Sequence, residues 1–185
     1  VALGASTGGP GALLEILQAI PVRFPLPVLI VLHIGDPFAI AFADWLDGQS
    51  GHEVAFAQER EVLRGGRVLL APPGCHLLVR GGRVLLTSDP ERHSCRPSVD
   101  VLFESVAAEY GAAAFACLLT GMGRDGAAGL LQVRTAGGET AAQDEATSIV
   151  YGMPREAVLL GAAEHVLPLP AIGPFIASLA GRAED

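Results

Sequence analysis

The sequence of 185 residues predicts an α/β protein of three layers, in which helices cover both faces of a doubly wound, mainly parallel sheet. First, short apolar runs of strand type alternate along the chain with segments whose apolar residues recur at helical spacing. Second, half of the residues are hydrophobic, which indicates buried sheet and helix. Third, the pair Gly81-Gly82 between two strand-type runs predicts one antiparallel hairpin.

In the first half of the chain, proline and glycine mark where the predicted elements begin and end. Pro10 suits the first turn of a helix, because its missing N–H has no partner there. Asp36 and Pro37 are interpreted as the N-cap and the first residue of the next helix. The predicted elements are a strand ending near Leu3, a helix through residues 13–17, a strand at 28–32, a helix through 38–46, strands around 53–57 and 68–71, and hairpin strands at 76–79 and 83–87.

In the second half, Ser98 is the predicted N-cap of a helix over residues 99–110, because a serine hydroxyl can accept a hydrogen bond from the first turn. Asp100 falls in that turn, where a negative charge is favourable. The elements that follow are a strand at 114–119, a helix through 130–133 ending near Gly137, a short strand at 140–142, a helix at 155–160 opened by Pro154, a strand at 165–167 and a helix at 172–179. No repeat or linker interrupts this order, so residues 1–185 are predicted to form one domain.

The most informative motif is the pentapeptide GASTG at residues 4–8. It has the pattern G-x-S-x-G, which places a nucleophilic serine on a sharp turn between a strand and a helix. The apolar residues before it and the helical pattern after it fit that context. On such a turn the hydroxyl of Ser6 stands clear of the backbone, and amide groups at the start of the helix can stabilise an oxyanion. The competing interpretation is a glycine-rich turn without chemistry.

Two further residues predict how this serine is activated. Ser6, His33 and Asp125 each come directly after a predicted strand and at or before a predicted helix. Because the carboxyl ends of parallel strands meet at one edge of a sheet, the three side chains are expected together there. They are the groups that deprotonate a hydroxyl and hold the imidazole in the right tautomer. The chain has no lysine for a Ser–Lys dyad and no asparagine for a Cys-His-Asn arrangement, so an activated serine must depend on histidine and a carboxylate.

Each of these assignments has an alternative. His33 can be interpreted as a core histidine at a strand end, and Asp125 as the N-cap of a helix that begins at Gly126. The chain order Ser-His-Asp differs from the Ser-Asp-His order of α/β-hydrolases, so the motif does not imply that fold. The other candidate bases are His52 and His93 in polar loops, His76 at the hairpin and His165 at a late strand, and the other candidate acids are Asp36 and Asp144.

Composition argues against several classes of function. The formal net charge is −8 and no basic run is present, so nucleic-acid binding is not expected. No apolar run has the roughly 18–20 residues of a membrane span and no signal peptide is recognisable, so membrane insertion is not expected. The three cysteines lack C-x-x-C spacing, which favours a reducing cytoplasm over disulfides or a zinc site. No metal or organic cofactor is expected. A nucleotide-phosphate loop at residues 4–11 is the weaker alternative, because its spacing matches neither G-x-G-x-x-G nor the Walker A motif.

Five segments of the chain carry a resemblance to a known family. They are GASTGG at 4–9, RPSVDVLF at 96–103, LLTGMGRDGA at 118–127, AQDEA at 142–146 and YGMPREA at 151–157. In this order they closely resemble the catalytic domain of bacterial chemotaxis methylesterases, the CheB family. The resemblance implies the same sheet with its antiparallel hairpin. It also implies hydrolysis of glutamate γ-methyl esters on chemoreceptor cytoplasmic domains with release of methanol and, as in many members, deamidation of receptor glutamines.

The resemblance assigns roles to residues of this chain. The family's nucleophilic serine falls on Ser6, its histidine on His33 and its aspartate on Asp125. The family pattern also gives Thr7 and Met122 a part in shaping the site and the oxyanion hole. The implied substrate partner is the methylated cytoplasmic domain of a chemoreceptor.

Two departures from the family pattern concern the base and the domain organisation. Members usually carry glutamine before the histidine and methionine after it, where this chain has Leu32 and Ile34. Typical members also have an N-terminal receiver domain, whereas this chain begins at the catalytic strand. Two interpretations stay open: a receiver domain in a longer chain or on a partner protein, or a stand-alone or differently fused esterase. The alternatives are a Ser-His-Asp esterase or amidase with another substrate, and a non-catalytic scaffold that binds receptors.

Overall fold

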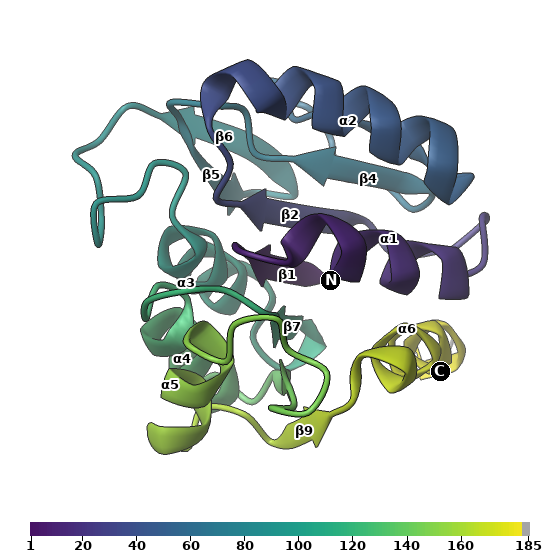
Figure 1. Ribbon diagram of the computed structural model, residues 1–185. Coiled ribbons are helices and arrows are strands. Elements are labelled where there is room, and N and C mark those ends of the chain that lie inside the picture. Colours follow the sequence, from purple (N-terminus) through teal and green to yellow (C-terminus); the bar gives the residue numbers. More distant parts are fainter. Residues whose placement is uncertain (183–185) are drawn as a thin grey trace.

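The computed structural model describes residues 1–182, and seven strands form its main sheet. The sheet strands are β1 (Ala2–Ala5), β2 (Val28–Leu32), β3 (Glu53–Phe56), β4 (Arg67–Leu70), β7 (Phe115–Leu118), β8 (Glu139–Gln143) and β9 (His165–Leu167). Their order across the sheet is β3-β4-β2-β1-β7-β8-β9, and every neighbouring pair is parallel. The predicted doubly wound, mainly parallel sheet is therefore confirmed (Figure 1).

Helices cover both faces of this sheet. One face carries α1 (Gly9–Ala19), α2 (Asp36–Ser50) and α6 (Leu169–Ser178), and the other carries α3 (Val99–Tyr110), α4 (Ala127–Thr135) and α5 (Met153–Leu159). Two short 3₁₀ helices, η1 (Gly111–Ala113) and η2 (Leu179–Arg182), complete the described elements. Each face has its own apolar core: Leu13, Phe42 and Ile172 belong to the first, and Phe103 and Leu130 to the second. The three predicted layers are present.

The antiparallel hairpin stands apart from the main sheet. It consists of β5 (His76–Arg80) and β6 (Arg83–Thr87), with Arg80 paired to Arg83 across the turn. Gly81 and Gly82 both have positive φ, 58° and 66°. The tight two-residue hairpin turn needs such φ values, and residues other than glycine rarely adopt them. The apolar side of the hairpin packs on α3 within the second core. The predicted hairpin is confirmed at its predicted turn.

The predicted boundaries hold to within a few residues. Helix α2 begins at Asp36 itself and its N-cap is Gly35, so the prediction of Asp36 as the cap is wrong by one residue. Helix α5 begins one residue before Pro154 and α6 begins at Leu169, three residues earlier than predicted. Proline is tolerated at the second position of a helix, because the N–H groups of the first turn have no partner inside the helix. A proline near a helix start therefore locates that start to within one residue.

The order of the strands positions a functional site. Strand β1 is central, with β2 on one side and β7 on the other. The helix after β1 covers one face, whereas the helix after β7 covers the opposite face. The chain therefore winds in opposite directions on the two sides of β1, and ligands of open α/β sheets bind at the carboxyl ends of the strands at such a point. The arrowheads of β1 and β2 point to the left in Figure 1.

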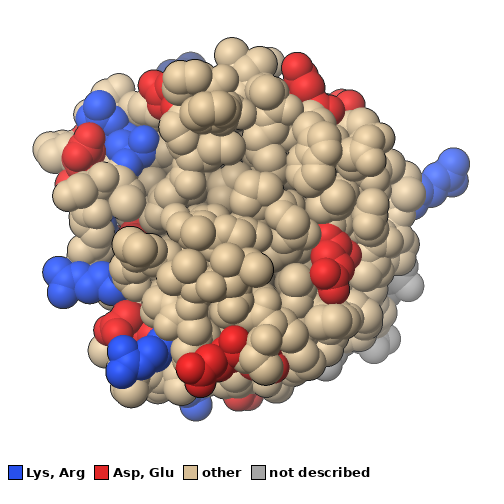
Figure 2. Space-filling view, viewed as in Figure 1, with Lys and Arg blue, Asp and Glu red and all other residues tan. Residues whose placement is uncertain are grey.

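The surface charges lie mainly at the margin of the face over α1 and α6. Figure 2 shows both acidic and basic side chains around its rim, including the left-hand edge where the strands end, and a largely uncharged centre. Within residues 1–182, no helix is long and apolar enough to cross a membrane.

Candidate active site

Ser6 follows β1 directly, on the predicted turn between a strand and a helix. Its N–H donates to the carbonyl oxygen of Thr120 at 3.0 Å, and its own carbonyl oxygen accepts from the N–H of Gly9 at 2.7 Å. Gly8 has a φ of 83°, which lets the chain reverse sharply into α1. The side chain of Ser6 is half-buried at the carboxyl edge of the sheet. The backbone context that the G-x-S-x-G motif requires is present.

His33 stands beside Ser6 because of the register of two strands. Ala5 of β1 pairs with Leu32 of β2, and the N–H of His33 donates to the carbonyl oxygen of Ala5 at 3.0 Å. Ser6 and His33 are therefore the next residues on neighbouring parallel strands, which run about 4.8 Å apart. This register brings together residues separated by 27 positions in the sequence.

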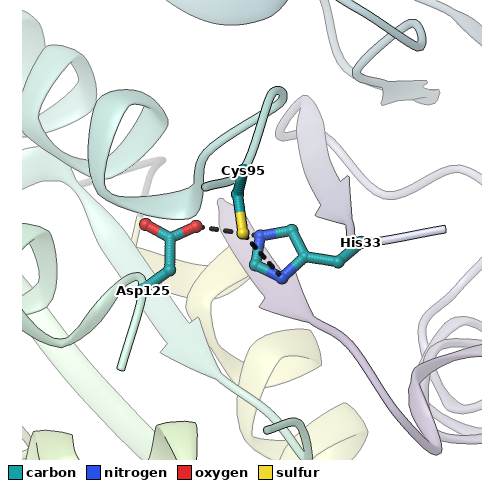
Figure 3. Close-up of side chains that lie close together, drawn as sticks. All are labelled: His33, Cys95 and Asp125. Atoms are coloured by element: carbon teal, nitrogen blue, oxygen red, sulfur yellow. Dashed lines mark hydrogen bonds and ion pairs between the residues drawn. The ribbon is translucent and has the colours of Figure 1, made fainter. Parts of the chain in front are cut away.

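Asp125 reaches His33 from the loop after β7. Its Oδ2 lies 2.8 Å from Nε2 of His33, and the two side chains point toward each other in Figure 3. The carboxylate is 3% exposed and the imidazole 16%, so water competes little for this bond. The arrangement fits a carboxylate that orients an imidazole.

The N-terminus of α3 holds the carboxylate of Asp125. The hydroxyl of Ser98 donates to Oδ1 at 2.7 Å, and the backbone N–H groups of Val99 and Asp100 donate at 2.7 Å and 3.1 Å. Burial would raise the pKa of Asp125, but the hydrogen bonds from His33, Ser98 and the two amides outweigh it and hold the pKa below its usual value. The carboxylate of Asp125 is therefore ionised at neutral pH, where it accepts the hydrogen bond from His33. It does not cap the helix that follows it, whose N-cap is Gly126 without any side-chain bond.

Replacing Ser98 tests this support. We expect Ser98→Ala to reduce turnover about tenfold and to destabilise the fold by about 1–2 kcal/mol, because it removes both the N-cap of α3 and a donor to Asp125. With one donor lost, the pKa of Asp125 rises toward its usual value. The ionised carboxylate is then lost at a higher pH, and the acidic limb of both the activity and the stability profile moves upward.

The measurement for Ser98→Ala is a pH profile of ester hydrolysis together with chemical denaturation at several pH values. Ser178→Ala is the matched control, since its hydroxyl in α6 makes one hydrogen bond, to the carbonyl oxygen of Phe175. An unshifted acidic limb in Ser98→Ala would contradict the assigned support and leave only a helix cap.

Nδ1, the imidazole nitrogen of His33 that does not face Asp125, is the one available to Ser6. Because Nε2 faces Asp125, the tautomer with its proton on Nε2 leaves the lone pair of Nδ1 free to act as a base. Within the described chain, the hydroxyl of Ser6 makes no hydrogen bond. Catalytic hydrogen bonds of this kind often form only when substrate binds. The pairing of Ser6 with Nδ1 thus stays a prediction.

Cys95 occupies the space on the Nδ1 side of His33. Its Sγ lies 3.8 Å from Nδ1, and the thiol donates to the carbonyl oxygen of His93 at 3.4 Å. Burial, followed by the charges of Asp125 and Glu91, raises the pKa of Cys95 to about 11. The thiol is thus protonated at neutral pH and is not a competing nucleophile.

A cleft of about 610 Å³ opens at this edge, lined by His33, Asp125, Met122, Arg124 and Glu156 among others. Met122 is 71% exposed, as a residue that contacts substrate can be. The backbone N–H groups of Thr7 and Met122 donate to no acceptor within the described residues, so both are free for an oxyanion. This availability supports the predicted oxyanion hole, whose role stays a prediction.

Gly121 provides the close approach between the loop after β7 and the nucleophile turn. A Cβ at this position would lie 2.4 Å from Sδ of Met153 and 2.7 Å from Cβ of Ser6. We expect Gly121→Ala to cost about 1–3 kcal/mol of stability and to lower turnover, because the added methyl group must displace Ser6 or Met153. Gly11→Ala is the matched control. A Cβ there meets nothing within 4 Å, and we expect a gain of about 0.5–1 kcal/mol in denaturation experiments. Equal effects at both glycines would contradict the assigned contact.

The other histidines have structural partners. His52 lies in the loop between α2 and β3, as predicted, but it is buried: it is 5% exposed, and its Nε2 lies 2.9 Å and 3.2 Å from the carbonyl oxygens of Leu17 and Ile20 at the end of α1. His76 is buried against Ser98 and the carbonyl oxygen of Pro90. His165 lies 3.2 Å from Glu139. His93 is exposed, lines the cleft and lies 3.1 Å from Asp100.

Two side chains of the site, one buried and one partly buried, were not identified from the sequence. Gln143, at the end of β8, accepts from the N–H of Thr120 at 2.9 Å and so fixes the loop that carries Met122 and Asp125. Cys95 contacts the imidazole itself. A polar residue at the end of a predicted buried strand was the available signal for Gln143, whereas nothing in the spacing of Cys95 indicated His33.

Family comparison decides how this site is to be interpreted. The model of the CheB methylesterase family matches residues 1–176. The chain belongs to the CheB methylesterase family. The crystal structure of the Thermotoga maritima CheB methylesterase catalytic domain superposes with a TM-score of 0.92 at 35% identity, covering 96% of both chains. The fold that the resemblance implied is therefore confirmed.

Curated relatives of CheB type are close in sequence. The protein-glutamate methylesterase FrzG of Myxococcus xanthus is 48% identical over 174 residues, which cover 94% of this chain and 52% of FrzG. A protein-glutamate methylesterase/protein-glutamine glutaminase of Burkholderia thailandensis is 50% identical over 183 residues, which cover 98% of this chain and 54% of that protein. The chain thus spans about half the length of the curated relatives that it matches.

Proposed function

We propose that residues 1–185 are a CheB-type catalytic domain that hydrolyses glutamate γ-methyl esters on the cytoplasmic domains of chemoreceptors and releases methanol in the cytoplasm. The observation that carries the proposal is the partly buried hydrogen bond of 2.8 Å between His33 and Asp125, set beside Ser6 at the carboxyl ends of β1, β2 and β7. The names of relatives about 50% identical support the substrate.

In the first half of the reaction, the hydroxyl oxygen of Ser6 attacks the γ-carbonyl carbon of the ester. His33 accepts the hydroxyl proton at Nδ1, and Asp125 stabilises the resulting imidazolium through Nε2. The N–H groups of Thr7 and Met122 donate to the oxyanion. The intermediate collapses, the carbon–oxygen bond to the methoxy group breaks, and His33 gives its proton to the leaving methanol.

In the second half, water takes the place of methanol. His33 removes a proton from the water as it attacks the glutamyl ester on Ser6, and then returns that proton to the oxygen of Ser6. The products are a free glutamate side chain and the regenerated serine. No step needs a group other than these residues and water.

Deamidation is the second candidate activity, since several relatives also carry the name protein-glutamine glutaminase. The same attack on a glutamine side chain would expel ammonia in place of methanol, with His33 protonating the leaving nitrogen. A receiver domain, in a longer chain or on a partner, is the proposed regulator.

The test is methanol release from a methyl-esterified chemoreceptor cytoplasmic domain, run beside ammonia release from the unmodified glutamine form. Release of methanol supports the methylesterase, and release of ammonia adds the deamidase. Hydrolysis of a generic ester, with no methanol or ammonia released from the receptor, would mean that the triad acts on another substrate. No hydrolysis of any ester, with intact fold, would favour the non-catalytic scaffold.

A further inference from the structure

Three different metal-ligating side chains converge beside Ser6. Within the described residues, one ligand atom each of His33, Cys95 and Asp125 lies within 4.8 Å of the other two. Figure 3 shows that the thiol and the carboxylate approach the imidazole from different elements, the loop before α3 and the loop after β7. The mechanism above uses the imidazole and the carboxylate and leaves the thiol without a role.

The chemistry of this set matches a borderline-soft divalent cation. Thiolate, imidazole and carboxylate are the three ligand types of protein zinc sites, and zinc sites with three protein ligands keep a fourth position for water. Tetrahedral zinc separates its ligand atoms by about 3.3–3.8 Å, given bonds of about 2.0–2.3 Å. Nδ1 of His33 and Sγ of Cys95 lie 3.8 Å apart, at the upper end of this range.

The surroundings favour a cation at this point. The charges of Asp125 and Glu91 both act on the sulfur of Cys95, and Asp100 lies near as a further buried acid. The guanidinium of Arg124 lines the same cleft but is directed away, with its Nε donating to Nδ1 of His93 at 3.3 Å. The cleft leaves the cluster accessible to an ion from solvent.

We propose that His33, Cys95 and Asp125 form an inhibitory zinc site built on the catalytic histidine. On binding, the thiol proton is lost to solvent, and the metal takes the sulfur, one imidazole nitrogen and a carboxylate oxygen as ligands. The imidazole lone pair is then unavailable to Ser6, so zinc switches off hydrolysis reversibly. The inhibitory effect rests on the proposed function, whereas the metal site itself does not.

Direct binding tests the site without any assay of activity. We expect Zn²⁺ to bind the whole chain with one equivalent in calorimetry, and Co²⁺ to give a thiolate-to-cobalt charge-transfer band. Cys95→Ser should weaken Zn²⁺ binding by at least about 100-fold and abolish the band, because the thiolate ligand is lost. Cys75→Ser is the matched control, since Cys75 is also partly buried but lies outside the cluster, and it should bind like the wild type.

A second possible metal site lies nearby, and the binding test distinguishes it from the first. His93, Asp100 and Asp125 also place ligand atoms within 4.8 Å of one another, without a thiol. Binding there would give no thiolate band and would survive Cys95→Ser. Either result, or no binding of Zn²⁺ at all, overturns the proposal.

Methanol release then tests the inhibition. Zinc should suppress hydrolysis by the wild type, and a chelator should restore it. The rate of Cys95→Ser, compared with its own rate in metal-free buffer, should be unchanged in zinc that stops the wild type. Ester hydrolysis that zinc leaves unchanged, despite binding at Cys95, would refute the inhibitory role. A metal-free protein that hydrolyses no ester would instead contradict the proposed function, while the binding data would still decide the site.

Discussion

Ser6→Ala is expected to abolish ester hydrolysis while leaving the fold unchanged. The hydroxyl is the only group removed. It makes no hydrogen bond within the described chain, so its loss leaves no buried partner unsatisfied. The backbone bonds of Ser6 to Thr120 and Gly9 stay intact. Loss of a serine nucleophile lowers turnover on the order of 10⁵–10⁶-fold, whereas we expect unfolding free energy to change by less than about 0.5 kcal/mol.

The measurement for Ser6→Ala combines methanol release with thermal unfolding and with labelling by a serine-reactive phosphonate. Ser94→Ala is the matched control, because Ser94 lines the cleft beside His33 and Cys95. We expect it to hydrolyse and to be labelled like the wild type. Substantial activity in Ser6→Ala would show that another group is the nucleophile. Lost activity together with a lowered melting temperature would point to a structural role of the turn instead.

The sequence predicted the layers of the fold because each depends on a local pattern. Apolar runs such as Val28–Leu32 must be buried on both faces, and only a sheet covered by helices on both sides does that. The hairpin was predictable because its turn needs two residues of positive φ, which two adjacent glycines supply. The edge of the sheet where Ser6, His33 and Asp125 meet followed from the direction of parallel strands alone.

What the sequence could not predict depends on contacts between distant elements. The hydrogen bond from Ser98 to Asp125 joins a helix cap to a loop 27 residues further on, so a cap was visible but its second partner was not. The nitrogen that faces Asp125 is set by the rotamer of His33, which no spacing encodes. His52 follows a polar, glycine-containing stretch typical of a loop, yet its ring lies at the last carbonyl groups of α1 and is buried.

Asp125→Asn is expected to lower turnover about 10⁴-fold, because an amide cannot replace a carboxylate that accepts on every side. If its NH₂ takes the place of Oδ2, it faces both Nε2 of His33 and the N–H of Val99. The imidazole must then present its lone pair at Nε2 and carry its proton on Nδ1, the wrong tautomer for a base toward Ser6. If the NH₂ takes the place of Oδ1, it faces the N–H of Asp100.

Either orientation leaves one backbone donor of α3 opposite another donor, so Asp125→Asn should also cost about 1–3 kcal/mol of stability. The pKa of Asp125 is lower in the folded protein than in the unfolded chain, so its stabilisation is fully present above the usual aspartate pKa of about 3.9 and is lost as the pH falls through the folded value. Denaturation at several pH values should therefore show the wild type and the variant converging at acid pH.

Glu156→Gln is the matched control for the lost charge, since Glu156 lines the same cleft without contacting His33. We expect its turnover to stay within about a factor of two of the wild type, because the carboxylate of Glu156 is partly exposed and water weakens its interaction with other charges. Equal losses in Asp125→Asn and Glu156→Gln would mean that general negative charge, rather than the oriented imidazole, sustains catalysis. A large loss in Asp125→Asn alone would identify the carboxylate held by α3 as the group that makes Nδ1 a base.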